Sequence, residues 1–297
     1  MSKVSLIIPF YNAQDYLHEC IKSAQEQSLD DIEIILINDG STDKSFEIAQ
    51  NFLKSDNRIK FFNRENCGYG ASVNFGIKKA QSEFISILEA DDFMARDMLE
   101  KLYHNSKNCE IVKSSFYFYP KNQKYSEIKN QKTNVFKNPE ILTLKPSIWS
   151  AIYSREFLIK NSIFMNEEKN KSFQDVSFQF KAFLCAKNIV FLDSPLYYYR
   201  QNPHQSVKSK NKIYDILDEF NLIDEFMKNL DFSDEIYVQK TLFELKAYIW
   251  NFKRTKSFDF LKKASKKLKC SKYNLTKEKN IKLKDKIKFF LLTNFLA

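Results

Sequence analysis

The feature that most constrains the fold is an alternation, through the first ninety residues, of short apolar segments with segments whose apolar residues recur at helical spacing. The short segments are Val4–Ile8, which has β-branched residues, Ile32–Ile37, Arg58–Asn63 and Phe84–Leu88. Each of these predicts a buried strand, and the segments between them, such as Ala13–Gln27 and Ala71–Ala80, predict helices. Strands that alternate with helices indicate an α/β fold with a largely parallel sheet flanked by helices, and ligands bind beyond the carboxyl ends of such strands.

The alternation weakens beyond Asp92. The elements predicted there are a helix near Arg96–Asn105, a strand near Glu110–Tyr119, an exposed polar loop over residues 121–138, and strands at Ile189–Leu192 and Leu196–Arg200. From about residue 208 onward, apolar residues recur at helical spacing and only helices are predicted. We therefore expect an α/β domain over residues 1–207 and an all-helical C-terminal region over residues 208–297.

The net charge of +10 is concentrated at the end of the chain. Residues 253–297 hold fifteen basic and three acidic side chains, a net charge of +12, which leaves −2 for the first 252 residues. A basic groove in the main domain is therefore not expected, and neither is a nucleic-acid partner. The tail mixes lysines with apolar residues and has two interpretations. It forms an amphipathic helix that contacts an anionic membrane, or a solvated basic face whose apolar side packs on the protein.

No apolar stretch approaches the roughly 20 residues that a transmembrane helix needs. The N-terminus turns polar at Tyr11 and Asn12, before a signal peptide could be completed. The five cysteines are widely spaced and form no C-x-x-C pair, so neither a disulfide framework nor a zinc site is indicated. These observations predict a cytoplasmic protein, which lies at the inner face of the cytoplasmic membrane if the tail binds lipid.

Four short motifs lie at or just beyond the predicted strands of the first domain. They are Val4-Ser5-Leu6-Ile7-Ile8-Pro9-Phe10-Tyr11-Asn12, Asn38-Asp39-Gly40-Ser41-Thr42-Asp43, Asn66-x-Gly68 with Asn74-x-Gly76, and Glu89-Ala90-Asp91-Asp92. In this order and spacing they resemble the family 2 glycosyltransferases of the GT-A fold, and fainter matches extend to about residue 207. The resemblance implies a Rossmann-like fold and inverting transfer of a sugar from a nucleotide-sugar donor. The implied acceptor is a saccharide or lipid-linked saccharide of bacterial capsule or lipooligosaccharide synthesis.

The residues after the first two predicted strands are candidates for binding the nucleotide. A carboxylate at Asp39 can accept a hydrogen bond from the N3–H of a uracil ring, while Pro9 and Tyr11 can flank the base. The backbone at Asn66 and Gly68 can approach the donor closely. In the family the matching positions contact the nucleotide, and a UDP-sugar is the expected donor. Without the resemblance, the Asp39 position would be explained as an ordinary turn.

Two adjacent carboxylates, Asp91 and Asp92, end the last predicted strand of the alternation, and they repel each other unless a cation or solvent relieves the repulsion. Mn²⁺ or Mg²⁺ held by such hard oxygen ligands can neutralise the charge that develops on a diphosphate leaving group. The resemblance implies that Asp92 ligates the metal and that Asp91 belongs to the donor site. Glu89 stands where the family commonly has Asp, at a position that meets the ribose or sugar. His204 is a further candidate for contact with the metal or the pyrophosphate.

Inverting transfer needs one general base that takes the proton from the acceptor hydroxyl. Asp175 is the candidate, because the family usually reads Glu-Asp before an aromatic-rich helix and this chain has Gln174 and Asp175 there. The alternative role for Asp175 is that of a helix N-cap. Trp149 is a candidate for the donor site, where it stacks on a sugar, or else it fills the core.

Two other functions fit parts of the pattern. A nucleotidyltransferase shares the alternating fold and the acidic metal site, but it needs a glycine-rich phosphate loop, and residues 9–14 contain no glycine. A catalytically degenerate transferase would instead serve as a membrane-bound scaffold of a polysaccharide-assembly complex. The presence of Asp39, Asp92 and Asp175 disfavours that alternative.

Overall fold

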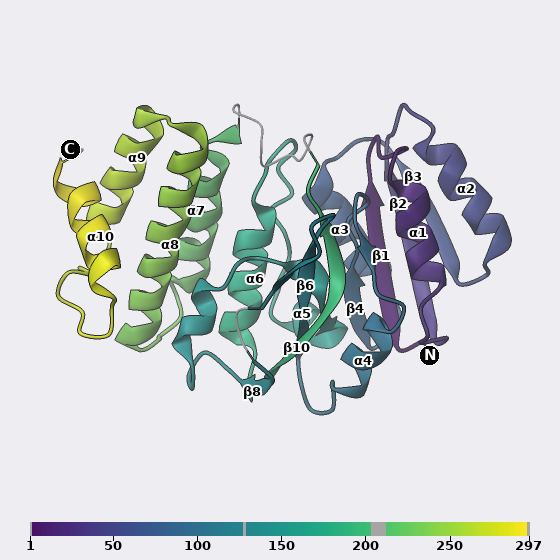
Figure 1. Cartoon of the computed structure of the whole chain (residues 1–297), viewed down its shortest axis with the longest axis horizontal. Helices are drawn as coiled ribbons and strands as arrows, with labels where there is room; N and C mark the ends of the chain where they lie inside the picture. Colours follow the sequence, from purple (N-terminus) through teal and green to yellow (C-terminus); the bar gives the residue numbers. More distant parts are fainter. Residues whose placement is uncertain (1, 127–128, 203–211, 296–297) are drawn as a thin grey trace.

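A ten-stranded sheet occupies the first two thirds of the computed structural model, which describes residues 2–126, 129–202 and 212–295 (Figure 1). Its order is β3-β2-β1-β4-β9-β6-β10-β5, with β7 paired to β6 and β8 paired to β10. The strands are β1 (Val4–Phe10), β2 (Ile32–Asp39), β3 (Ile59–Arg64), β4 (Phe84–Ile87), β5 (Phe93–Met94), β6 (Ile111–Tyr119), β7 (Gln123–Tyr125), β8 (Gln131–Thr133), β9 (Ala151–Ser154) and β10 (Ile189–Arg200). The longest pairings, β1–β2, β2–β3, β1–β4 and β6–β10, are parallel, which confirms the largely parallel sheet.

Helices flank the sheet and then continue beyond it. They are α1 (Leu17–Gln25), α2 (Ser45–Ser55), α3 (Tyr69–Lys79), α4 (Met98–His104), α5 (Arg155–Lys160), α6 (Gln174–Cys185), α7 (Asp215–Met227), α8 (Asp234–Thr255), α9 (Phe258–Lys269) and α10 (Leu283–Phe295), with 3₁₀ turns η1 (Pro139–Thr143) and η2 (Ile148–Ser150). Right-handed crossovers place α1 and α2 on one face of the sheet and α3 on the other, because the connection through α3 reverses direction along the sheet. Figure 1 shows α7 to α10 beside one another at the end of the molecule opposite α2.

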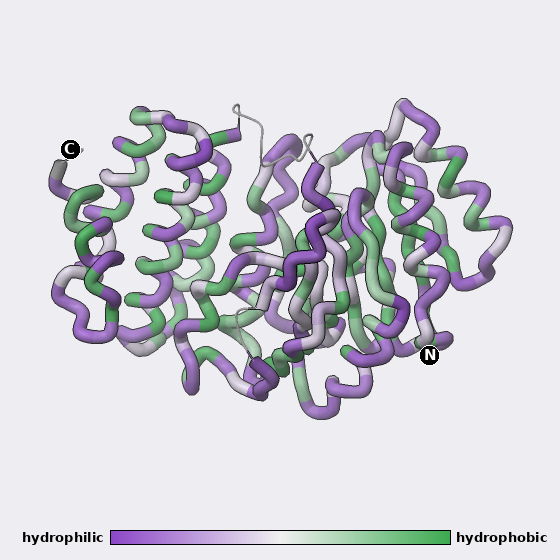
Figure 2. Tube along the Cα trace, in the orientation of Figure 1, coloured by the Kyte–Doolittle hydropathy of each residue, from purple (hydrophilic) through white to green (hydrophobic). Residues whose placement is uncertain are grey.

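The central strands are buried on both faces, which explains why their sequences are continuous apolar runs rather than alternating ones. Every residue of β1 and β2 is buried, and Figure 2 shows hydrophobic segments concentrated in these strands. Gly76 lets α3 approach them closely, since an added Cβ would lie 2.5 Å from Cγ2 of Ile7 and 2.9 Å from Cδ1 of Ile37. The N-terminal half of the sheet is therefore a rigid base for the loops at its carboxyl edge.

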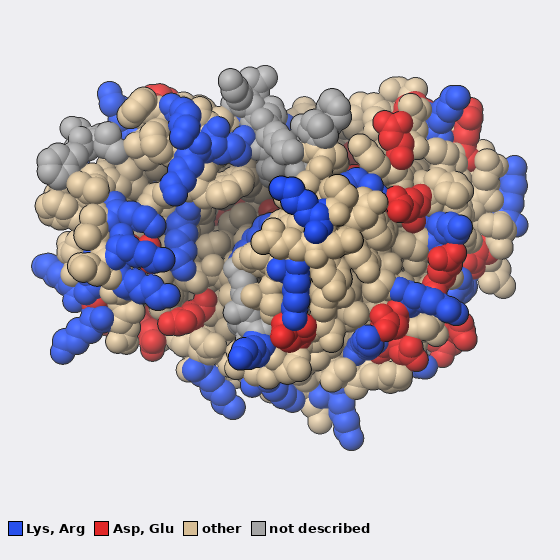
Figure 3. All heavy atoms as spheres, viewed as in Figure 1, with Lys and Arg blue, Asp and Glu red and all other residues tan. Residues whose placement is uncertain are grey.

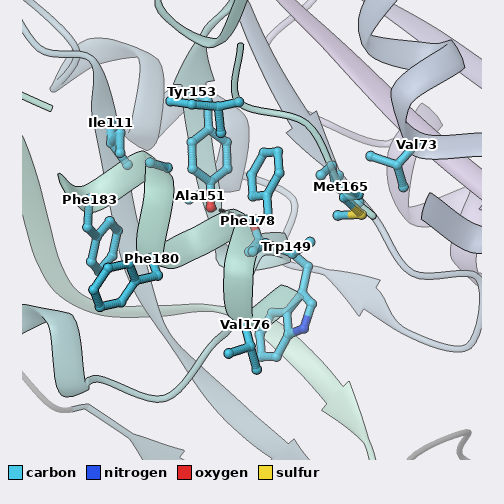
Figure 4. Close-up of a cluster of buried hydrophobic side chains, with 14 of the residues drawn as sticks. Val73, Ile111, Trp149, Ala151, Tyr153, Met165, Val176, Phe178, Phe180 and Phe183 are labelled. Atoms are coloured by element: carbon cyan, nitrogen blue, oxygen red, sulfur yellow. Dashed lines mark hydrogen bonds between the residues drawn. The ribbon is translucent and has the colours of Figure 1, made fainter. Parts of the chain in front are cut away.

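Helix α6 joins the sheet to the C-terminal helices. Phe178 and Phe183 are buried together with Tyr153 of β9 in the cluster of Figure 4. Phe180, on the same helix, stacks on Phe243 of α8 with ring centroids 6.2 Å apart. One helix thus contributes to both parts of a continuous core.

Two details of the sequence prediction are wrong. Residues 121–138 were expected to form an exposed loop, yet β7 and β8 lie within that segment, because backbone pairing with β6 and β10 compensates for its polar side chains. The two strands expected between residues 189 and 200 are the single strand β10, whose register with β6 shifts around Pro195. The division of the chain at residue 207 stays a prediction, since residues 203–211 lie outside the described residues.

Candidate active site

The loops after β1 and β2 lie together at the carboxyl edge of the sheet. Pro9 is buried within β1, whereas Tyr11, just beyond the strand, is 51% exposed. The backbone N–H of Asn12 donates to Oγ of Ser41 over 3.0 Å, and the backbone N–H of Thr42 donates to Oδ1 of Asn12 over 2.8 Å. These hydrogen bonds hold the two loops as one unit.

Asp39 fastens a third loop to this unit. Its buried carboxylate accepts hydrogen bonds from the backbone N–H groups of Cys67 and Gly68 and from the Ser72 hydroxyl, each 2.9 Å long. Gly40 beside it has φ +76°, and an added Cβ would lie 2.8 Å from the backbone nitrogen of Asn66. The structure therefore brings Asp39, Asn66 and Gly68 together, as the motifs predicted, and gives Asp39 a structural role that the sequence did not reveal.

Asp92 is buried and hydrogen-bonded through both carboxylate oxygens. It is 1% exposed, its Oδ2 accepts from the Tyr197 hydroxyl over 2.8 Å, and its Oδ1 accepts from the backbone N–H of Arg200 over 2.7 Å. Burial, followed by the charge of Asp91, raises the pKa of Asp92 well above its usual value. Asp92 therefore connects the loop after β4 to the end of β10.

Asp91 and Glu89 differ from Asp92 in being only partly buried. Oδ2 of Asp91 accepts from Nδ2 of Asn202 over 2.7 Å, and burial raises its pKa. Glu89 accepts a hydrogen bond from the Tyr69 hydroxyl. Burial raises the pKa of Glu89 to about 8, with the Tyr69 hydrogen bond acting in the opposite direction and smaller increases from nearby carboxylates.

Asp175 lies in the first turn of α6, directly after Gln174. Burial raises the pKa of Asp175 to about 6, and the positive charge of Lys145 opposes that rise. The pKa of Tyr199, on β10, is raised by burial and then by the charges of four carboxylates: Asp92, Asp175, Asp91 and Glu89. The carboxylates from the loop after β4 and from α6 therefore lie within electrostatic range of one phenol.

Helix α7 holds the segment that leads into α6. Glu219, fully buried, accepts from Oγ of Ser177 over 2.5 Å and from Nδ2 of Asn166 over 3.1 Å. Asp215 accepts from the backbone N–H of Ser172 over 2.8 Å. No sequence pattern indicates these roles, because Glu219 and Asp215 lie in a helix whose main pattern is an apolar stripe.

Trp149 lies in an aromatic cluster of the core. It is 5% exposed and lies among the buried side chains of Figure 4. Its ring stacks on Tyr197 at 4.3 Å and on Tyr199 at 5.1 Å between centroids. Of the two roles expected for Trp149, this position favours core filling, and any effect on the donor is transmitted through β10. His204 lies outside the described residues.

The residues present fit a divalent cation only in part. Among the residues that the structure describes, no group of three or more His, Cys, Asp and Glu side chains is placed to hold a metal ion. Asp92, the expected ligand, is 1% exposed and accepts a hydrogen bond at each oxygen, so its burial keeps it from a cation in solvent, whereas the carboxylate of Asp91 is partly exposed and supplies a hard oxygen. A cation that takes one or two protein carboxylates and completes its shell with substrate phosphates and water fits this arrangement.

Comparison with known proteins identifies the family. Residues 5–174 match the family described as Glycosyl transferase family 2. The chain belongs to glycosyltransferase family 2. A relative from Bacillus subtilis (strain 168), the uncharacterized glycosyltransferase EpsJ, is 33% identical over 213 residues, which are 68% of this chain and 62% of the relative. The chain thus spans less than two thirds of that relative.

Solved structures of low sequence identity share the GT-A fold. Residues 1–349 of TarS from S. aureus, in complex with UDP, superpose with a TM-score of 0.73 at 19% identity, over 98% of this chain and 90% of that one. The mannosyltransferase PcManGT from Pyrobaculum calidifontis, in complex with GDP-Man and Mn²⁺, gives 0.62 at 15% identity, over 89% and 75%. The resemblance to family 2 and the expected α/β fold with C-terminal helices are confirmed.

We predict that the two adjacent carboxylates of this family 2 protein differ in their effect on stability. Asp92→Ala leaves the Tyr197 hydroxyl and the Arg200 N–H without their acceptor, so the free energy of unfolding should fall by roughly 2–5 kcal/mol. Asp91→Ala removes one acceptor, that of Nδ2 of the buried Asn202, so the loss should be smaller, about 1 kcal/mol. Urea unfolding of both variants measures the difference, and equal losses would contradict the structural role of Asp92.

Proposed function

We propose that the protein is a metal-dependent inverting glycosyltransferase. It transfers a hexosyl or N-acetylhexosaminyl group from a UDP-sugar to a saccharide or lipid-linked saccharide acceptor in bacterial capsule or lipooligosaccharide synthesis. The observation that carries the proposal is the convergence of Glu89, Asp91 and Asp175 on the carboxyl edge of the sheet, where Tyr69 links Glu89 to the loop that Asp39 holds. Membership of family 2 and the UDP complex of TarS support it.

The nucleotide site is proposed at the loops after β1, β2 and β3. Tyr11 is exposed there and offers a ring to the base. Oδ2 of Asp39 accepts one hydrogen bond among the described residues, from Gly68, and a carboxylate oxygen can accept a second from the N3–H of uracil. Asn66 and Gly68 then lie beside the ribose and the diphosphate. The GDP-Man complex of PcManGT has a different base, so UDP is a proposal specific to this chain.

The metal role is proposed for Asp91 in place of Asp92. A bound Mn²⁺ or Mg²⁺ would neutralise negative charge on the diphosphate leaving group. Asp91 is the partly exposed carboxylate of the pair, and Asn202 orients it through Oδ2. Asp92 then acts indirectly, because its hydrogen bonds fix the backbone on which Asp91 stands.

Asp175 is proposed to take the proton from the acceptor hydroxyl as that oxygen attacks the anomeric carbon. A pKa of about 6 leaves the carboxylate mostly ionised at neutral pH and still basic enough to accept a proton. The charge of Lys145 lowers the pKa of Asp175 and so favours the ionised form. A single base serves direct displacement, so the product should have the opposite anomeric configuration to the donor.

We predict that Asp91→Asn abolishes the Mn²⁺ dependence of UDP binding. An amide oxygen is a neutral and weaker ligand for a hard cation, whereas the fold tolerates the change at this partly exposed position. Isothermal calorimetry of UDP with and without Mn²⁺ measures the effect independently of turnover. The matched control is Asp43→Asn, in the loop after β2, which should keep the metal effect. A metal effect of parental size in Asp91→Asn would exclude Asp91 as the ligand.

We predict that Asp175→Asn lowers kcat by roughly 10²–10⁴-fold while the affinity for the UDP-sugar stays close to that of the parent. Asn keeps the shape of Asp but cannot accept the proton. Turnover is measured against a panel of UDP-sugars, and NMR of the product anomeric proton reads the configuration. Retained configuration or near-parental turnover would contradict the mechanism. A parent that binds UDP-sugars and transfers nothing would support the scaffold alternative instead.

We predict that kcat follows the protonation of Asp175. Below pH about 6 the base is protonated, so kcat should fall about tenfold per pH unit, and above that pH it should level off. Lys145→Met removes the charge that lowers the pKa of Asp175, so the midpoint should move to higher pH. Lys54→Met, an exposed lysine of α2, should leave the midpoint unchanged. A profile that stays flat through pH 6 would contradict the assignment.

A further inference from the structure

Helix α10 has apolar residues on two opposite faces. Phe289 and Leu292 are buried against the neighbouring helix α9, whose Ser265 donates a hydrogen bond to the backbone oxygen of Leu292 over 2.8 Å. A second set of apolar side chains is between 48% and 72% exposed: Leu283, Ile287, Phe290 and Leu291. Burial against α9 therefore accounts for one of the two apolar faces and leaves the other largely exposed.

The exposed set forms one stripe along the helix. Its members are spaced i, i+4, i+7 and i+8, and such positions share a face of an α-helix. At 3.6 residues per turn, Lys284 and Lys288 border this stripe on one side and Lys286 borders it on the other. The acidic residue of α10, Asp285, is buried on the opposite face and pairs with Lys288, whose Nζ lies 3.4 Å from Oδ1 of Asp285, so Lys284 and Lys286 are the lysines available to lipid phosphates. We call residues 283, 287, 290 and 291 the α10 stripe.

We propose that the α10 stripe docks the protein on an anionic membrane, with α10 lying in the plane of the interface. The apolar side chains enter the boundary between headgroups and acyl chains, and the flanking lysines meet the lipid phosphates. Among the described residues, no helix is both long enough and apolar enough to cross a membrane, so this contact is peripheral. The inference goes beyond the proposed transferase activity and does not depend on it.

The charge of the surrounding surface matches an anionic bilayer. Lys262, Lys266 and Lys269 on α9 are exposed. Figure 3 shows basic side chains gathered over the C-terminal helices, while most of the acidic side chains visible in that view lie toward the other end of the molecule. In Figure 1, α10 is at the outer edge of the molecule, where a flat surface can reach it.

A second copy of the chain fits the α10 stripe less well than a membrane does. A helix of 13 residues is about 20 Å long and about 10 Å wide, a footprint of roughly 200 Å², whereas a stable interface buries about 800 Å² per partner. A symmetric contact through the stripe would also bring Lys284 and Lys288 close to the same lysines of the second copy. Contact with anionic headgroups avoids the repulsion between lysines, and it does not require a protein–protein interface of about 800 Å².

Vesicle co-sedimentation of the full chain tests the proposal. Binding is expected to vesicles of equimolar phosphatidylcholine and phosphatidylglycerol, and not to phosphatidylcholine alone. Leu291→Gln should lower the partition coefficient roughly tenfold. Leu53→Gln, at a comparably exposed leucine of α2, should leave it unchanged. Both positions are on the surface, so equal melting temperatures show that folding is not the cause of a difference.

The lysines give a second comparison. Lys284→Gln combined with Lys286→Gln should lower partitioning by roughly fivefold per lysine. Lys54→Gln combined with Lys107→Gln, which removes the same charge from exposed positions in the N-terminal half, should have little effect. If partitioning falls equally in the two double variants, binding depends on the net charge of the protein alone, and the docking of α10 is overturned.

Insertion of the stripe is read by fluorescence. Phe290→Trp is made in a Trp250→Phe background, which retains the buried Trp149. The difference in emission between this variant and the same background with Phe290 should shift to shorter wavelength on binding and be quenched by brominated acyl chains. Binding without shift and quenching would overturn the proposal, as would binding that Leu291→Gln leaves unchanged. The parent chain could instead fail to bind vesicles and form a dimer that Leu291→Gln dissociates in sedimentation analysis. That result would show that the α10 stripe contacts a second copy of the chain.

Discussion

The hydrogen bonds of the buried Asp92 carboxylate are the constraint on which the candidate site depends. In the sheet, β4 and β10 are separated by β9 and β6, yet β5, directly after Asp92, pairs with β10. The intervening residues therefore cross the carboxyl edge of the sheet, and Asp92 fixes the far end of that crossing through Tyr197 and Arg200. Burying a carboxylate is costly unless its oxygens are hydrogen-bonded, so the crossing has one favourable position. The hydrogen bonds of Asp92 therefore also hold the adjacent Asp91 in position at the candidate site.

Contacts from α7 hold the chain on both sides of Asp175. Three acidic residues on one face of α7 hold the segment that leads into α6: Asp215 binds the Ser172 amide, Asp218 pairs with Lys171 at 2.6 Å, and Glu219 reaches Ser177. Burial raises the pKa of Glu219 to about 7, and its hydrogen bonds oppose that rise. Because these hydrogen bonds are lost together when α7 moves, α7 is coupled to Asp175, the proposed base. The helical region is thus part of the site as well as a candidate membrane contact.

The sequence could predict the features that neighbouring residues determine, but not the contacts between residues far apart in the chain. The strands β1, β2 and β4 and the positions of Asp39 and Asp175 depend on neighbouring residues, and apolar runs, turns and motif spacing were sufficient to predict them. The motif suggested the metal for Asp92 and the donor for Asp91, but the burial and hydrogen bonds that distinguish the two side chains depend on distant strands. Tyr197 is 105 residues from Asp92 and Glu219 is 42 from Ser177, so no local pattern reveals either contact. The tail shows the same limit, since its composition predicted an amphipathic helix but could not tell the buried face of α10 from the exposed stripe.

Glu89, the departure from the usual family motif, gains a physical explanation from these contacts. Its side chain is one methylene longer than that of Asp, and its carboxylate reaches the Tyr69 hydroxyl at the start of α3. The residue before Tyr69 is Gly68, whose φ of +95° sets the entry to the helix and whose N–H binds Asp39. A continuous path of hydrogen bonds and covalent bonds therefore runs from Asp39 through Gly68 and Tyr69 to Glu89. A shorter Asp at position 89 would leave the Tyr69 hydroxyl out of reach, whereas Glu couples the proposed base-binding loop to the acidic motif. In the proposed function, this path would link the loop that binds the nucleotide to the motif that meets the sugar.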